Sequence, residues 1–352
     1  MAVMTLAGVE VRRGADTVLD DVSLEVERGE RIGLVGRSGS GKTSLLRVMA
    51  GLDSPASGDV LVAGRPMAGT RREVTMVFQE DAVYDHLDVG ENLEFPFRVT
   101  SRAGGRHIDD TADRFLIRAL LGRAATELSA GQRHVVSAAR ALVRPEVEVV
   151  LLDEPMVGTD PHRRRLLVEA LAGDSTLTLV ISTNDPADVL RWSTRAVVLA
   201  DGGIAQTGVP VDVYRRPVSL EVAEVMGELN RLPAGLHRNG EWWLELAGSR
   251  IKIPDPPRNL VPGERVVLGI RPEALAPADE TVPFARRLRA TVGRTEVVGP
   301  TRRIYFGIGS VAGTGFVAEV DSRHRLQVGD RVDWEIRSKD MLLFDAPTGR
   351  RL

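Results

Sequence analysis

The stretch that decides the fold is Gly36-Arg37-Ser38-Gly39-Ser40-Gly41-Lys42-Thr43, which matches the pattern G-x-x-x-x-G-K-[ST] at every position. An apolar, β-branched run precedes it at 31–35, and apolar residues at helical spacing follow it. In a strand, glycine-rich turn and helix of this order, backbone N–H groups and the helix dipole converge on phosphate oxygens. The pattern predicts a nucleotide-binding loop rather than a turn that binds nothing, made by Gly36, Ser38, Gly39, Gly41, Lys42, Thr43 and Ser44.

Two side chains of this loop have predicted roles of their own. Lys42 is expected to reach the β- and γ-phosphates, and the Thr43 hydroxyl is expected to bind Mg²⁺. Lys42 is one of only three lysines, with Lys252 and Lys339, in a chain whose other basic residues are arginine. A lysine kept here is consistent with the need for a compact ammonium. The predicted ligands are ATP and Mg²⁺.

The rest of the chain indicates an α/β domain followed by a small all-β domain. Continuous apolar runs at 147–152, 177–182 and 196–200 are typical of parallel strands buried on both faces. Such strands alternate with helical patterns, for example at 110–121 and 130–143, over the first part of the chain. After about residue 232, short β-type runs separated by glycine and proline indicate a barrel or sandwich. We therefore expect domains at 1–230 and 231–352.

Length and composition argue against several classes of function. A chain of 352 residues suggests two domains, and a net charge of -3 argues against a nucleic-acid partner. The absence of cysteine excludes disulfides, thiolate metal sites and cysteine nucleophiles. No apolar run approaches the ~18 residues that span a bilayer, and the start of the chain lacks the apolar core of a signal peptide. We expect an intracellular protein whose membrane role depends on a partner.

A pair of carboxylates follows one buried strand, in Val149-Val150-Leu151-Leu152-Asp153-Glu154. Asp153 is expected to hold Mg²⁺ through water, and Glu154 is expected to orient and activate the attacking water. A charged exit from a strand is the structural alternative. Two adjacent acids after four apolar residues, downstream of a phosphate loop, favour the catalytic interpretation.

A third motif, Leu128-Ser129-Ala130-Gly131-Gln132-Arg133, opens a helix ahead of Asp153. A serine here is by itself an ordinary N-cap. Together with the other motifs, however, the sequence resembles the ABC ATPase family, a P-loop NTPase family whose signature is LSGGQ. Two chains of that family hold ATP between the phosphate loop of one and the signature of the other. The resemblance implies roles at ATP for Ser129, Gly131, Gln132 and Asp160, and a role at Mg²⁺, water and the membrane subunit for Gln79.

Four further segments resemble the carbohydrate-importer branch, which carries a C-terminal OB-like TOBE regulatory domain; they are 80–93, 203–230, 268–275 and 342–349. The resemblance implies two membrane permeases, a second ATPase subunit (this chain itself or a paralogue), and indirectly an extracytoplasmic solute-binding protein. It implies a peripheral position on the cytoplasmic face of the cell membrane. The implied function is ATP-driven solute uptake, with a sugar favoured, although relatives moving polyamines, iron or oxyanions share the layout.

The chain departs from this family at four places. Asn184 stands where most importers have a histidine that contacts the γ-phosphate and helps hold the catalytic glutamate, and loss of one preorganised donor costs on the order of 10²-fold in rate. Arg13 replaces the aromatic residue on which adenine stacks, and is either a stacking guanidinium or a surface arginine. Ala130 replaces the first signature glycine, and the segment ending at Asp160 differs from the usual sequence.

These departures leave three hypotheses open. The chain is a slow but genuine ATPase, with Glu154, Gln79 and Asn184 as its catalytic residues. Alternatively, it is a degenerate subunit that binds ATP without efficient turnover and pairs with a second ATPase. In the third hypothesis it is a regulatory ATP-binding protein whose β domain binds an effector.

Overall fold

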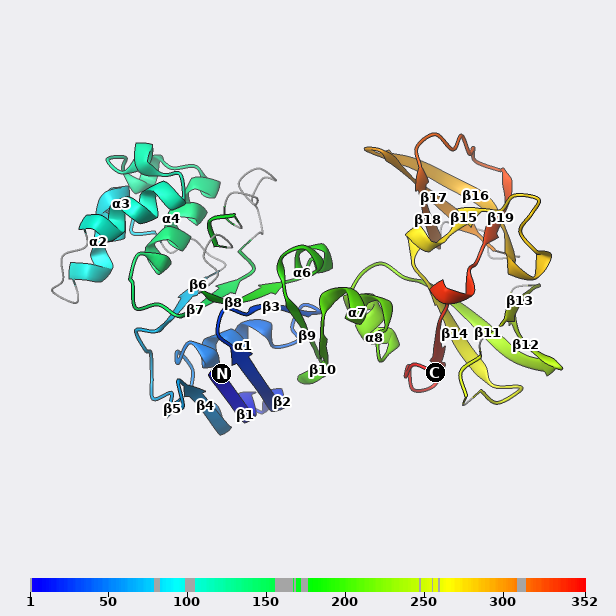
Figure 1. The fold of residues 1–352 in the computed structure, drawn as a ribbon, viewed down its shortest axis with the longest axis horizontal. Helices are drawn as coiled ribbons and strands as arrows, with labels where there is room; N and C mark the ends of the chain where they lie inside the picture. The colour runs from blue at the N-terminus through cyan, green and yellow to red at the C-terminus, as the bar shows by residue number, and fades with distance from the viewer. Residues whose placement is uncertain are drawn as a thin grey trace. The chain divides into compact units, whose positions relative to one another are not determined.

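The computed structural model describes residues 2–78, 83–98, 105–155, 167, 169–171, 177–246, 248–254, 256–258, 260–308 and 315–352. They divide into two compact units, residues 1–213 and 214–352 (Figure 1). The expected boundary at 230/231 therefore lies later in the chain than the observed division between Val213 and Tyr214.

The first unit is built on a six-stranded sheet. Its strands are β3 (Arg31–Gly36), β6 (Val74–Val77), β7 (Val149–Asp153), β8 (Thr178–Thr183), β9 (Arg195–Ala200) and β10 (Gly203–Gly208). Their order is β10-β9-β3-β8-β7-β6, and all neighbours are parallel except β9 and β10. Every described residue of β7 and β8 is buried, as expected for parallel strands covered on both faces. The continuous apolar runs of the sequence thus form the centre of this sheet.

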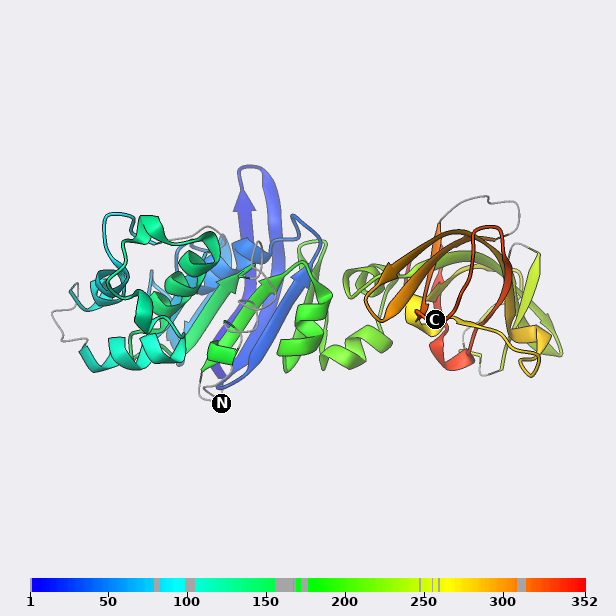
Figure 2. The ribbon, with the colours of Figure 1, turned by 90° about the horizontal axis from the view of Figure 1, so that it is seen from above.

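A second, antiparallel sheet completes the first unit. Its strands, in the order β2-β1-β4-β5, are β1 (Ala2–Arg13), β2 (Asp16–Glu27), β4 (Ser57–Val62) and β5 (Arg65–Pro66). The long hairpin of β1 and β2 is the blue pair of strands in Figure 2. Its alternating buried residues, among them Val9, Leu19 and Val22, join a core shared with Ile32 and Leu45.

The helices of the first unit are α1 (Lys42–Met49), α2 (Val89–Arg98), α3 (Gly105–Arg114), α4 (Ala130–Leu142) and α6 (Pro186–Trp192). The division between the units falls within α7 (Pro210–Arg215). Short 3-10 turns occupy Arg118–Leu120 and Ala125–Glu127. The expected helix at 110–121 is wrong in its extent, because α3 already ends at Arg114 and Leu116 adopts a left-handed φ of 54°. Buried residues of α2, α3 and α4 share a core with β7 and β8.

The second unit contains two five-stranded antiparallel sheets, the curved ribbons on the right of Figure 2. One has the order β13-β12-β11-β14-β20, and the other has the order β15-β19-β16-β17-β18. The strands are β11 (Asn230–Asn239), β12 (Glu241–Leu246), β13 (Ser249–Ile253), β14 (Arg265–Ile270), β15 (Ala276–Pro277), β16 (Arg287–Val298), β17 (Thr301–Gly307), β18 (Phe316–Asp321), β19 (Arg331–Glu335) and β20 (Leu342–Asp345). Three 3-10 turns lie between strands at Pro272–Ala274, Phe284–Arg286 and Ser338–Asp340. The inner faces of both sheets share one core, which includes Leu268, Phe306 and Trp334.

Packing of one short helix explains the early division between the units. Helix α8 (Leu220–Val225) places Ala223 against Leu342 and Phe344 of β20. The backbone N–H of Leu220 also donates to the carbonyl of Gly349. Residues that precede β11 in sequence are therefore held by the last strand of the chain, and they belong to the second unit.

Candidate functional site

The carboxyl ends of three neighbouring parallel strands form the candidate site. Gly36 is the last residue of β3, Asp153 is the last residue of β7, and Asn184 directly follows β8, which lies between them. Ligands of open α/β sheets bind at this edge. The topology therefore brings together the phosphate loop, the carboxylate pair and Asn184.

Glycine is required sterically at two positions of the phosphate loop. Gly41 has a φ of 98°, and a Cβ there would lie 2.5 Å from Cδ2 of Leu19. A Cβ on Gly36 would lie 2.6 Å from the carbonyl oxygen of Leu199. Gly39 also has a positive φ, 81°, but an added Cβ would have no neighbour within 4 Å. The path of the loop thus needs conformations and clearances that only glycine supplies.

The start of α1 is open to a ligand. Its N-cap is Gly41, and no side chain caps the helix, so its first backbone N–H groups remain available for an anion. Ser38, Gly39 and Thr43 are exposed, whereas Lys42 and Ser44 are buried. These residues present the donors expected of a phosphate-binding loop.

Lys42 is buried, and its ammonium group is surrounded by oxygen atoms of the protein. Its Nζ donates to the carbonyl oxygens of Gly36 (2.9 Å) and Arg37 (3.1 Å) and to Oδ1 of Asn184 (2.8 Å). Burial lowers the pKa of Lys42, and the nearby carboxylates of Glu154 and Asp153 oppose that shift. The ammonium is thus held at the mouth of the loop, where phosphate would lie.

Asp153 is buried and connects the loop to β8. Its Oδ1 accepts from the Ser182 hydroxyl (2.7 Å) and from the Thr43 hydroxyl (3.2 Å). Ser182 is its register partner in the parallel pair of β7 and β8. The structure therefore brings two of the three predicted metal ligands, Thr43 and Asp153, into direct contact.

Glu154 leaves β7 in an unusual backbone conformation. Its φ is 46°, which a residue with a side chain rarely adopts without support from its surroundings. Its backbone N–H donates to the Ser182 hydroxyl (3.0 Å), which fixes this turn. The strained turn directs the Glu154 side chain to Asn184.

Asn184 bridges the lysine and the glutamate. Its Oδ1 accepts from Lys42, and its Nδ2 donates to Oε1 of Glu154 (2.5 Å). Only this orientation of the amide is chemically possible, because an ammonium can only donate and a carboxylate can only accept. Asn184 therefore lies between Lys42, the predicted phosphate-binding group, and Glu154, a predicted catalytic group.

This arrangement suits phosphoryl chemistry assisted by a hard cation. The Thr43 hydroxyl and the Asp153 carboxylate are the oxygen donors that Mg²⁺ prefers, and Mg²⁺ usually binds through few protein ligands together with water and phosphate. Among the described residues, no cluster of three or more His, Cys, Asp or Glu side chains could hold a metal by itself. The residues present thus fit a cation bound together with a phosphate ligand.

Comparison with known proteins agrees with this geometry. The family described as ABC transporter matches residues 19–157, and the TOBE domain family matches residues 268–344. The chain is 34% identical over 369 residues to the sn-glycerol-3-phosphate import ATP-binding protein UgpC of Chromobacterium violaceum, covering 100% of this chain and 96% of that protein. The chain belongs to the ATP-binding subunits of ABC transporters.

Two further similarities extend this result. The trehalose/maltose import ATP-binding protein MalK of Thermococcus litoralis is 32% identical to this ABC subunit, with 100% of both chains covered. A solved ATP-binding subunit of an ABC transporter aligns with a TM-score of 0.56 at 24% identity, covering 61% of this chain and 92% of that one. The solved structure supports the fold alone, whereas the sequence relatives span the whole chain.

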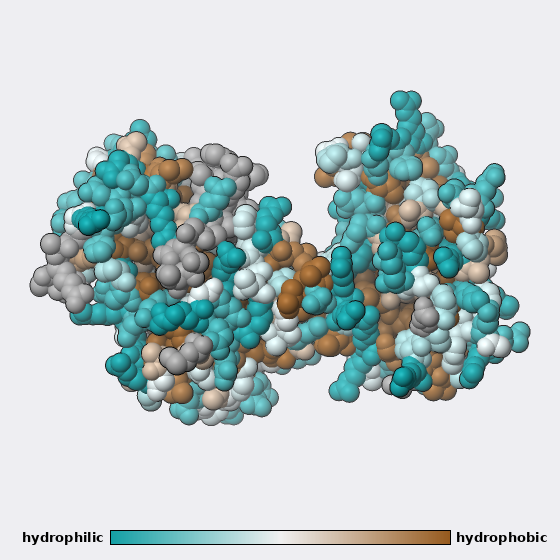
Figure 3. Space-filling model, viewed as in Figure 1, coloured by the Kyte–Doolittle hydropathy of each residue, from teal (hydrophilic) through white to brown (hydrophobic). Residues whose placement is uncertain are grey.

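As a member of this family, the ABC subunit binds ATP and is an ATPase coupled to transport. Import subunits of this kind are peripheral to the membrane and work with membrane permeases and a substrate-binding protein. In the described part of the chain, no helix is long and apolar enough to cross a bilayer. Hydrophilic residues cover most of the face of each unit shown in Figure 3, between smaller hydrophobic patches.

The signature forms the capped start of α4. The Ser129 hydroxyl accepts from the backbone N–H of Gln132, and the Gln132 side chain accepts from the backbone N–H of Ser129 (3.0 Å). Gly131 is buried beneath this turn. Within the described residues, the side-chain hydrogen bonds of Ser129 and Gln132 join each other and not the phosphate loop. The ordinary N-cap interpretation therefore holds within one subunit.

Arg13 lies at the end of β1 and belongs to a small charge cluster. Its guanidinium pairs with Oδ2 of Asp53 (3.3 Å), and Arg47 contacts both oxygens of that carboxylate (2.8 Å each). Its side chain remains 57% exposed. Adenine stacking on Arg13 stays a prediction.

Two predicted residues, Gln79 and Asp160, lie outside the described residues. One functional residue was missed by sequence reasoning. Ser182 positions both Asp153 and Glu154, and its only sequence signal is a hydroxyl within the apolar run of β8.

Proposed function

We propose that this subunit binds Mg²⁺–ATP at the ends of β3, β7 and β8, and hydrolyses it with Glu154 to power import of a sugar. The continuous chain of hydrogen bonds from Lys42 through Asn184 to Glu154 carries the proposal. It joins the group that binds the transferred phosphate to the group that activates water. Such positioning, together with charge stabilisation, supplies most of the catalysis in phosphoryl transfer.

Thr43 and Asp153 would hold Mg²⁺, with Gln79 as a further ligand. Bound there, the cation would neutralise negative charge on the β- and γ-phosphates. Ser182 keeps the Asp153 carboxylate oriented through its 2.7 Å hydrogen bond. Lys42 donates to phosphate oxygens, and Glu154 accepts a proton from the attacking water.

Asn184 takes the place of the histidine in this mechanism. Its Nδ2 donor holds Glu154, and its Oδ1 becomes free when Lys42 turns to the γ-phosphate. Both N–H donors of the amide lie on Nδ2, which Glu154 already engages, and Oδ1 at the other end cannot donate to the γ-phosphate. We infer slow hydrolysis at this site, because one preorganised donor typically contributes on the order of 10²-fold.

A second ATPase subunit, either another copy or a paralogue, would complete each site. The intramolecular capping of Ser129 supports this, because the signature is already formed and its serine is exposed. In the assembled dimer, Ser129, Gly131 and Gln132 would contact ATP bound by the other subunit, and Asp160 would cross the interface.

The permeases are proposed to dock in a hollow of about 380 Å³ between α2, α4 and β6. Tyr84 and Phe95 pack there with ring centroids 4.5 Å apart, and the Arg140 guanidinium lies 4.5 Å from the Tyr84 centroid. Burial lowers the pKa of Arg140. An aromatic hollow with a buried cation suits an inserted permease segment, and movement of residues 79–93 would transmit dimer closure to it.

The substrate and the membrane face also belong to this proposal. Relatives named for import of trehalose/maltose, lactose and glucose support a sugar substrate. A solute-binding protein outside the membrane would deliver the sugar to the permeases. The ATPase subunits would then lie on the cytoplasmic face.

ATPase activity of the purified chain tests the proposal. We expect slow hydrolysis by the wild type, faster hydrolysis by Asn184→His, and ATP binding without turnover by Glu154→Gln. Robust wild-type turnover that Asn184→His leaves unchanged would refute an impaired site. No turnover in any variant, despite ATP binding, would instead indicate a degenerate subunit that needs a second ATPase. Co-purification with soluble proteins rather than permeases would indicate a regulator.

A further inference from the structure

The second unit contains a hollow with a strong excess of positive charge. Its volume is about 500 Å³, within the range of small-molecule sites. Two of its lining side chains are acidic and six are basic, the latter being Arg215, Arg216, Arg271, Arg337, Lys339 and Arg351. A neighbouring hollow of about 570 Å³ shares Arg337, Lys339 and Arg351 with it.

Both acidic side chains of the hollow are already engaged. Asp340 pairs with Nε of Arg337 (2.7 Å), and Glu273 accepts from the Tyr214 hydroxyl. Among the described residues, no carboxylate pairs with Arg215, Lys339 or Arg351. The hollow thus holds four more basic than acidic side chains, and both of its carboxylates are already paired.

Two of the six cations of the hollow are withdrawn from water, and the other four are exposed. Arg351 is partly buried, and burial, with a further contribution from the nearby Arg216, lowers its pKa. Arg271 is only 5% exposed, and its two terminal nitrogens donate to the carbonyls of Gly227, Glu228 and Tyr214. Its Nε has no hydrogen-bond partner in the described part of the chain. Like charges crowded in a partly desolvated place are typical of sites that bind the opposite charge.

We propose that this hollow binds a small soluble anion that carries at least two negative charges, of the class of phosphorylated small molecules. Guanidinium groups match phosphate oxygens in paired geometry, and an ammonium such as Lys339 adds a point charge. A ligand in the hollow would join residues 215–216, at the end of α7, to the 3-10 turn Ser338–Asp340 and to Arg351 near the end of the chain. Lipid headgroups share this chemistry, so the test includes them.

Titration calorimetry of the full chain with inorganic pyrophosphate tests the site. We expect Lys339→Gln and Arg351→Gln each to weaken binding about tenfold, because each removes one charge-assisted contact. Arg350→Gln is the matched control, because Arg350 is exposed and does not line the hollow. It should bind as the wild type does. Lys42→Ala, which weakens the phosphate loop, should retain pyrophosphate binding.

Three outcomes would overturn the proposal. They are equal affinity of the wild type and both hollow variants, loss of pyrophosphate binding in Lys42→Ala, and binding only to phosphatidylcholine vesicles that contain phosphatidic acid. The first would leave the hollow without a ligand role, the second would assign binding to the phosphate loop, and the third would assign the site to a lipid. Lys339 is exposed, so its variant should fold even if Arg351→Gln melts at a lower temperature.

Discussion

At the scale of single residues, Asn184 supplies with one amide the two contacts that hold Lys42 and Glu154 together. An amide does not titrate, whereas a histidine has an ordinary pKa of about 6.5 and changes charge near neutral pH. The amide of Asn184 therefore offers the same donors and acceptor at pH 6 and at pH 8. A histidine would make them depend on protonation.

This difference predicts the pH dependence of Asn184→His. Below about pH 6.5 the imidazole becomes a cation, which cannot accept from Lys42 and repels its ammonium. We therefore expect the ratio of variant to wild-type turnover to fall as the pH decreases through that range. Steady-state ATPase assays from pH 5.5 to pH 8.5 measure this ratio. Taking the ratio removes the effect of titrating groups that both proteins share. A ratio independent of pH would contradict the bridge.

The two left-handed glycines of the phosphate loop should respond differently to alanine. Gly39→Ala meets no neighbour and should lower the free energy of unfolding by about 1–2 kcal/mol through its φ of 81°. Gly41→Ala has the same backbone penalty and in addition brings Cβ to 2.5 Å from Leu19, so the loop must move. We expect ATP binding to survive the first change and to be lost in the second. Thermal melting and nucleotide titration compare them, and equal effects would refute the steric argument.

At the scale of elements, substitutions in the capping box of α4 can distinguish the structural role of Ser129 from its proposed role at ATP. Ser129→Ala should destabilise the first unit by about 1 kcal/mol, because the N–H of Gln132 loses its acceptor. Ser129→Asn should keep the cap and the stability but still lose turnover in the assembled dimer. Denaturant unfolding and ATPase assays measure the two effects. Normal turnover of Ser129→Asn would contradict the proposed contact with ATP of the other subunit.

Sequence patterns predicted strands best where burial of apolar side chains dominates. Uninterrupted apolar runs correctly predicted β7 and β8, because a strand that is buried on both faces consists mostly of apolar residues. No such run marks β11, which contains Pro233 and Gly235, or β16, in which apolar and polar residues are mixed. The role of Ser182 depends on the register of β7 against β8, a long-range property that no local pattern contains. The motifs thus predicted the residues that would bind phosphate and activate water, but not the residue that holds them in place.

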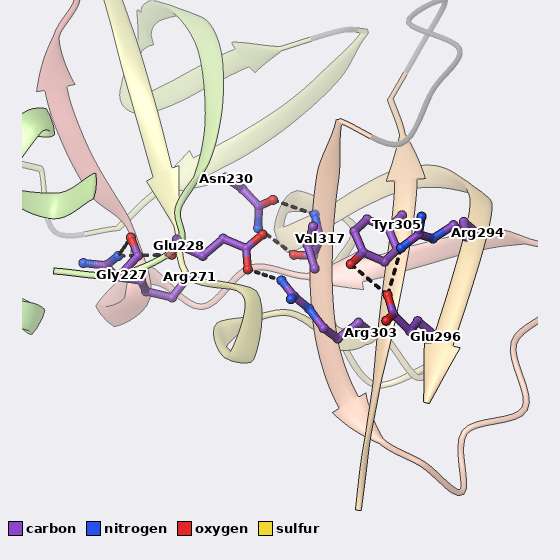
Figure 4. Close-up of polar contacts among 9 residues, drawn as sticks. All are labelled: Gly227, Glu228, Asn230, Arg271, Arg294, Glu296, Arg303, Tyr305 and Val317. Carbon is purple, nitrogen blue, oxygen red and sulfur yellow. Dashed lines mark hydrogen bonds and ion pairs between the residues drawn. The ribbon is translucent and has the colours of Figure 1, made fainter. Parts of the chain in front are cut away.

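At the scale of the whole molecule, each of the two sheets in the second unit depends on a buried polar connection to the other. Asn230 on β11 is 4% exposed, accepts from the backbone N–H of Val317 (2.7 Å) and donates to its carbonyl (2.7 Å). Figure 4 shows this exchange beside the ion pair of Glu228 with Arg303. The connection joins β11 of one sheet to β18 of the other.

Asn230→Ala should therefore unfold the second unit selectively. It leaves a buried donor and a buried acceptor of Val317 without partners, a loss of about 2–4 kcal/mol. Because the first unit has its own core, its ATP binding should persist. Differential scanning calorimetry should show one transition moved to lower temperature. Asn239→Ala, an exposed change at the end of the same strand, is the control. A shift of both transitions together would contradict independent units.

The three oxygen atoms around Lys42 also bear on how a spent nucleotide leaves. The ammonium donates to two loop carbonyls and to the Asn184 amide, so phosphate must compete with these acceptors. The contribution of Lys42 to nucleotide affinity is then the difference in free energy between its contacts with phosphate and its contacts with these protein oxygen atoms. After hydrolysis, the same oxygens recapture the lysine as the phosphate departs. We therefore expect these three oxygen atoms to weaken the retention of the product.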